Sequence, residues 1–83
     1  MNIDISQVRD KFAAVLNGSE SREAVSKWAR AIREADDRGE LFATPAADRM
    51  RIWHAILFLE GVDLRDSPES YLHNEIDIRR EQP

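Results

Sequence analysis

The sequence contains no cysteine. A disulfide, a thiolate metal site and a thiol nucleophile are therefore excluded. Because small secreted domains often depend on disulfides, this absence favours a protein of the reducing cytoplasm. The segment from Met1 to Ile5 also lacks the basic and apolar stretches of a signal peptide, so we expect none.

Long hydrophobic runs are missing as well. The longest one, Ala55–Leu59, is far shorter than the roughly 20 residues that a membrane span needs. With 83 residues and 34% charged side chains, the chain has the size of one domain and a composition that suits a freely soluble protein. A domain of this size has little room for a deep substrate cavity. We therefore expect a single helical domain over residues 1–83.

Glycine and proline are scarce, with three residues of each. Every glycine follows a predicted helix end or turn, so none belongs to a phosphate-binding loop. Apolar residues recur at helical spacing, and no segment shows the sustained alternation of a strand. We predict an all-α fold, a compact four-helix bundle-like domain, with helices over about residues 5–16, 22–37, 45–60 and 68–80.

All four predicted helices have a capping residue at their start, and for the second helix it is Ser19 or Ser21. Asp4 precedes the first helix and can accept a hydrogen bond from a free backbone N–H. Thr44 and Ser67 each stand directly before a proline, Pro45 and Pro68. A hydroxyl cap followed by proline is typical of a helix start, because the missing N–H costs nothing at the first helical position.

No arrangement of side chains indicates catalysis. The best general acid–base pair is His73 with Asp77, four residues apart on one predicted helix face, and such a pair is more often an exposed stabilising contact. The serines lack a nucleophile elbow, and no set of histidines and carboxylates has the spacing of metal ligands. We predict that the protein is not an enzyme and that it has no catalytic residues, no metal and no cofactor.

Acidic side chains are concentrated near the end of the chain. The segment from residue 60 to residue 77 holds six carboxylates and one fixed cation, Arg65, whereas the net charge of the whole chain is −4. A concentrated negative surface attracts basic partners and repels phosphate backbones. The six carboxylates are Glu60, Asp63, Asp66, Glu69, Glu75 and Asp77.

Apolar residues suited to an interface stand among these carboxylates. Tyrosine is a favoured interface anchor, and Tyr71 is the candidate here. We predict a surface on which charge speeds association with a basic protein and an apolar centre holds the complex. The predicted partner-binding residues are Val62, Asp63, Leu64, Asp66, Glu69, Tyr71 and Glu75. The alternative interpretation is a solvated acidic face that only aids solubility.

Two other functions are kept as alternatives. A small regulatory or DNA-associated domain would use the cations of the second helix, which are Arg22, Lys27, Arg30 and Arg33. These cations alternate with carboxylates and the sequence pI is about 5.1, so the composition predicts against a nucleic-acid partner. The other alternative is a homo-oligomeric structural domain, for example a homodimer. Its subunits would meet through the wide apolar surface of the third helix.

The stretch Asp66-Ser67-Pro68-Glu69 resembles the opening of the last helix in immunity proteins of nuclease colicins. The chain is also similar in size, charge and helical class to small acidic bacterial immunity proteins of the colicin and contact-dependent toxin type. This resemblance implies a cytoplasmic, non-enzymatic protein that binds and neutralises a basic toxin.

Overall fold

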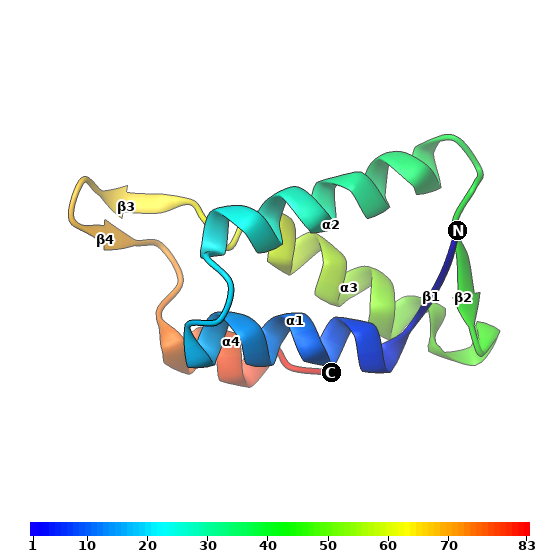
Figure 1. Ribbon diagram of the computed structural model, residues 1–83, viewed down its shortest axis with the longest axis horizontal. Coiled ribbons are helices and arrows are strands. Elements are labelled where there is room, and N and C mark those ends of the chain that lie inside the picture. Colours follow the sequence, from blue (N-terminus) through cyan, green and yellow to red (C-terminus); the bar gives the residue numbers. More distant parts are fainter.

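The computed structural model describes all 83 residues, and it contains four α-helices, one short 3-10 helix and four short strands (Figure 1). The strands form two separate two-stranded sheets, so the predicted all-α fold is wrong and the fold is mixed α/β. The elements in chain order are β1 Asn2–Asp4, α1 Ile5–Asn17, α2 Arg22–Asp37, β2 Phe42–Thr44, η1 Ala46–Asp48, α3 Arg49–Glu60, β3 Arg65–Ser67, β4 Ser70–Tyr71 and α4 Glu75–Glu81.

The first two helices are bounded by local hydrogen bonds. The Asp4 carboxylate accepts from the Gln7 N–H at 2.8 Å, and the Gln7 side chain accepts from the Asp4 N–H at 2.9 Å, which completes a capping box. Ser21 caps α2 by accepting from the Ala24 N–H at 3.1 Å. Gly18 ends α1 at φ 79°, a left-handed conformation that glycine adopts without a Cβ clash.

The hydrophobic core lies mainly between α2 and α3, with α1 closing it from the other side (Figure 1). Twelve buried apolar side chains form one cluster, which spans every helix and includes Ile3 of β1. At the end of α3, the buried Ser26 hydroxyl donates to the Glu60 carbonyl oxygen at 2.6 Å. This bond satisfies one of the carbonyl groups that a helix end leaves free.

The first sheet joins the start of the chain to the connector between α2 and α3. Strands β1 and β2 pair in parallel, with Ile3 opposite Ala43. The segment Phe42–Thr44 is therefore a strand, and α3 begins at Arg49 rather than near residue 45. Thr44 is the last residue of β2 and Pro45 precedes η1, so the hydroxyl and proline that indicate a helix start here form the corner after β2 instead. The Thr44-Pro45 peptide is cis.

The second sheet replaces the beginning of the predicted fourth helix. Strands β3 and β4 form an antiparallel hairpin with Pro68 and Glu69 at its turn. The Ser67 hydroxyl lies 2.9 Å from the Ser70 hydroxyl and accepts from the Glu69 N–H at 3.3 Å. Serine before proline is as typical of a turn as of a helix start, because proline presets the backbone angle that both need.

The last helix is consequently short. Asn74 caps α4 by accepting from the Asp77 N–H at 2.9 Å, and the Asp77 side chain accepts from the Asn74 N–H at 3.2 Å. Ile78 is its single buried residue and packs into the core. The hairpin and the β1–β2 pair lie at opposite ends of a molecule whose longest dimension is 38 Å (Figure 1). No helix is long and apolar enough to cross a membrane.

We expect Ile78→Ala to lower the free energy of unfolding by about 2–4 kcal/mol, because it leaves a cavity where α4 meets the core. Ile76→Ala is the matched control, since Ile76 is 65% exposed on the same helix and its loss should cost less than about 0.5 kcal/mol. Urea denaturation of both variants measures the difference. Equal losses would contradict the packing of α4 described here.

Candidate nucleic-acid interface

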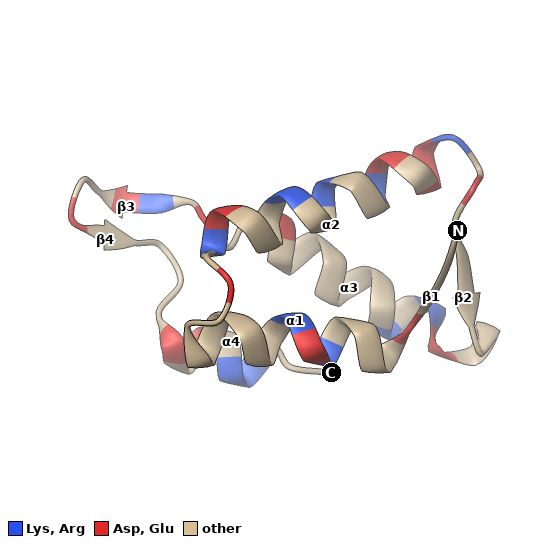
Figure 2. Cartoon of the chain, in the orientation of Figure 1, with Lys and Arg blue, Asp and Glu red and all other residues tan.

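Two of the six carboxylates between residues 60 and 77 are engaged by other groups of the chain. Glu60 is engaged by α2, because Arg33 donates to both of its carboxylate oxygens at 2.8 Å and Arg30 approaches one at 3.9 Å. Asp77 is engaged in the capping box of α4. The remaining four are distributed over a loop, the hairpin and α4, as the separate red segments of Figure 2 show.

The apolar residues predicted for a protein interface differ in their exposure. Val62 is completely buried in the core, where it cannot contact a partner. Leu64 is 54% exposed in the loop before β3. Tyr71 is half-buried, and its ring is covered on both sides by arginines of this chain.

Tyr71 lies between Arg22 of α2 and Arg65 of β3. The guanidinium carbons of Arg22 and Arg65 are 4.2 Å and 4.6 Å from the centre of its ring, within the range of cation–π attraction. The Tyr71 hydroxyl donates to a Glu23 carboxylate oxygen at 3.0 Å. Arg22 also donates to the carbonyl oxygens of Val62 and His73. This group of contacts, the Tyr71 stack, holds the hairpin against the start of α2.

Glu23 is the titratable member of the Tyr71 stack. Its own backbone N–H, the Tyr71 hydroxyl and the nearby Arg65 and Arg22 favour the ionised carboxylate, so the pKa of Glu23 lies below its ordinary value. A lowered pKa in the folded state means that ionised Glu23 stabilises the fold. This contribution to the free energy of unfolding is complete at a pH above the ordinary pKa of a glutamate. It is lost as the pH falls through the lowered pKa of Glu23 in the folded protein.

His73 and Asp77, the pair considered for acid–base chemistry, are not in hydrogen-bonding contact. The His73 Nδ1 atom lies 3.9 Å from an Asp77 oxygen. The imidazole instead packs on Phe58 of α3, with the ring centres 4.8 Å apart. Nor do three or more histidine and carboxylate side chains come together in a group that could hold a metal ion.

The basic side chains of α2 differ in whether they are available to bind an anion. The helix holds four basic and four acidic side chains and so has no net charge. Arg33 is committed to Glu60 and Asp37, and this hydrogen bonding with Glu60 raises the pKa of Arg33. With Arg22 in the Tyr71 stack, only Lys27 and Arg30 extend from the exposed side of α2.

Three exposed arginines without an ion pair lie on the opposite side of the molecule. Arg79 and Arg80 occupy the last turn of α4. Ile78 before them faces the core, whereas both arginines are exposed at the surface. Arg9 lies on α1, which packs against α4, and its Nε donates to the Pro83 carbonyl oxygen at 2.9 Å. Figure 2 shows the blue segments of α4 and α1 on this side. We call these three residues the α1–α4 arginine cluster.

Arginine is well suited to phosphate groups, because its planar guanidinium can donate two parallel hydrogen bonds. An arginine that is already paired with a carboxylate must break that pair first, whereas those of the α1–α4 arginine cluster need not. Asp10 and Glu81 are the carboxylates beside them in sequence, so the local charge balance is +1. The α1–α4 arginine cluster is therefore a candidate surface for phosphate groups.

Comparison with known sequences assigns the chain to a family that is described as DNA-binding. It matches the family model described as "YxzC DNA-binding protein" over residues 2–80, and it belongs to this family. It is also 41% identical over 69 residues to "Uncharacterized protein YxzC" of Bacillus subtilis (strain 168). That match covers 83% of this chain and 51% of the relative, so the chain spans about half the length of the curated relative. No solved structure matches.

The family membership overturns two predictions made from the sequence. The chain is not a member of an immunity protein family, and the resemblance at residues 66–69 reflects a hairpin turn rather than a shared helix start. The prediction against a nucleic-acid partner is also wrong, since the family is described as DNA-binding. That prediction rested on the acidic composition of the chain and on the carboxylates between the cations of α2.

We expect Glu23→Gln to lower the urea midpoint at neutral pH, because the neutral amide loses the attraction of Arg65 and Arg22. The difference between the wild type and the variant should shrink as the pH falls from neutral through the lowered pKa of Glu23, because the carboxylate is then protonated. Glu69→Gln is the control, since Glu69 has no ion pair and should show no such trend. A difference for Glu23→Gln that does not change with pH would contradict the Tyr71 stack.

Proposed function

We propose that this protein binds DNA without catalysing a reaction on it, and that the α1–α4 arginine cluster contacts the phosphate backbone. The single observation that carries the proposal is the match of residues 2–80 to a family described as DNA-binding. DNA binding also favours the compartment that holds bacterial DNA, the cytoplasm.

The choice of surface rests on which cations are free. Arg79 and Arg80 have no ion pair within the chain, Arg9 is held only by the Pro83 oxygen, and the three lie on two elements that pack together. Each phosphate contact releases condensed counterions from the DNA, so binding strength should fall as salt rises. Three contacts correspond to a slope of about −3 in the dependence of log K on log salt.

The absence of an oriented acid–base pair supports a binding role. His73 is 3.9 Å from Asp77, and the Asp77 carboxylate already accepts the Asn74 N–H. A general base needs a partner that fixes its orientation, and a candidate has to lie within hydrogen-bonding reach of the proton that it takes.

The exposed side of α2 is the competing surface, because Lys27 and Arg30 extend from it. The Arg30 Nε atom lies 3.9 Å from a Glu60 carboxylate oxygen, which is a weak ion pair. Glu23 and Glu34 occupy the same exposed side, so a phosphate there would meet repulsion as well as attraction.

The test compares two double variants that remove the same charge. Arg79→Gln with Arg80→Gln should reduce the salt slope by about 2 and weaken binding to a fluorescent duplex of about 20 base pairs. Lys27→Gln with Arg30→Gln should leave the salt slope and the binding strength nearly unchanged. Fluorescence anisotropy from about 50 to 200 mM salt measures both quantities.

Each result has a distinct meaning. Loss of binding only in the α2 variant would assign the contact to α2 and refute the α1–α4 arginine cluster. A wild-type protein that does not bind the duplex at low salt would refute the proposed function itself.

A further inference from the structure

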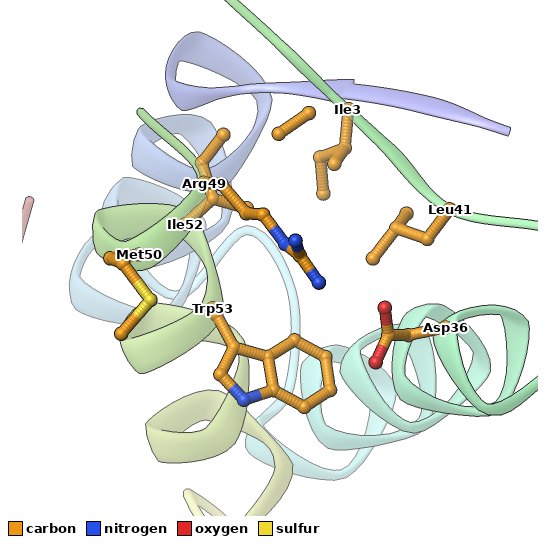
Figure 3. A pocket seen from close by; sticks show the side chains of 8 residues that line it. Ile3, Asp36, Leu41, Arg49, Met50, Ile52 and Trp53 are labelled. Carbon is orange, nitrogen blue, oxygen red and sulfur yellow. The ribbon is translucent and has the colours of Figure 1, made fainter. Parts of the chain in front are cut away.

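A cavity of about 440 Å³ lies at the end of the molecule that carries the β1–β2 pair, between that sheet, the last turn of α2 and the first turns of α3 (Figure 3). Pockets that enclose small ligands are typically 300–1,000 Å³, so this one has the size of a ligand site. Its apolar wall is made of Ile3, Leu41, Ala43, Met50, Ile52 and Trp53. None of these residues belongs to the α1–α4 arginine cluster.

Two side chains of opposite charge face each other across the cavity. The Arg49 guanidinium extends over the cavity toward the Asp36 carboxylate, with the Trp53 ring beside the space between them (Figure 3). Arg49 and Asp36 do not form an ion pair with each other or with any other residue. Each therefore has its hydrogen-bonding capacity free toward the cavity.

The two helix ends add to this separation of charge. Asp36 stands in the last turn of α2, where the helix dipole is negative and the turn itself contains no basic residue. Arg49 is the first residue of α3, where the dipole is positive and no side chain caps the helix. An ammonium group is favoured beside Asp36, and a carboxylate group is favoured beside Arg49.

We propose that this cavity binds a small zwitterion with an apolar side chain, the chemical class of the hydrophobic α-amino acids. The carboxylate of the ligand would pair with Arg49 and its ammonium with Asp36. Its side chain would lie against Trp53 and the aliphatic wall. The positive and negative groups of one ligand molecule match the two unpaired charges of the site. An uncharged apolar molecule would form no ion pair with Arg49 or Asp36.

The burial of the wall supports a defined shape for this site. Ile3 and Ile52 are each only 2% exposed, so the floor of the cavity belongs to the packed core. Met50 is 62% exposed at the rim and has a flexible side chain that can adapt to different occupants. The site therefore combines a rigid floor with an adjustable edge.

The experiment uses the whole chain without DNA, so its outcome is independent of the proposed DNA binding. Isothermal titration calorimetry with L-leucine and L-phenylalanine should detect binding. Tryptophan fluorescence, to which Trp53 and also Trp28 outside the cavity contribute, should change in parallel. Phenylalanine amide lacks the carboxylate and N-acetyl-phenylalanine lacks the ammonium. Each should bind at least about tenfold more weakly than phenylalanine, since each loses one charge-assisted contact.

Matched variants test the two charged residues. Arg49→Gln and Asp36→Asn should each weaken phenylalanine binding by roughly tenfold or more. Arg51→Gln and Asp37→Asn are the controls, because these neighbours pair with Asp48 and Arg33 outside the cavity and should bind like the wild type. Circular dichroism checks that each variant is folded.

Three outcomes would overturn the proposal. The first is that neither amino acid binds the wild type at about 10 mM. The second is that the amide and the acetylated compound bind as tightly as phenylalanine, a result that needs no variant. The third is that folded Arg49→Gln and Asp36→Asn proteins retain wild-type affinity.

Discussion

The contact between α2 and α3 is the interaction on which the rest of the structure depends. Buried apolar faces of both helices form most of the core, and polar contacts at Glu60 connect the end of α3 to residues within α2. The Ser26 hydroxyl binds the backbone of Glu60, while Arg33 binds its side chain. Because the two helices are joined in this way, the segments before and after α3 are brought to opposite ends of the molecule (Figure 1).

Local signals in the sequence predict the first two helices well. The capping box of Asp4 and Gln7, the Ser21 cap and the glycine after α1 act within a few residues, and the structure contains each of them. The strands could not be found in this way. A strand of three residues is too short to show alternation, and the pairing of Ile3 with Ala43 joins segments 40 residues apart.

The beginning of α4 shows how one local signal can serve two structures. Ser67 and Pro68 fit a helix start and a turn equally well, and the two serines that bond across the hairpin decide for the turn. The real start of α4 does have a signal, since Asn74 followed by Asp77 has the spacing of a capping box. The stronger serine–proline pattern upstream concealed it.

The candidate sites were less predictable than the helices, because they depend on contacts between distant segments. The sequence shows Arg22, Arg65 and Tyr71 as separate residues, and only the fold brings them together into one stack. In the same way, a total charge of −4 does not reveal that Arg79 and Arg80 stay free while Arg33 is committed. Charge composition predicts average behaviour, whereas binding depends on the few groups that have no internal partner.

The walls of the cavity come from four parts of the chain, β1, the last turn of α2, the β2 segment and α3. In the unfolded chain these walls are far apart, so a molecule that occupies the cavity has nothing to bind there. Occupancy and folding are therefore thermodynamically linked: a ligand at 100 times its dissociation constant would add about 2.7 kcal/mol to the native state. For a domain of this size, such an increment is a large share of a total stability of roughly 5 kcal/mol.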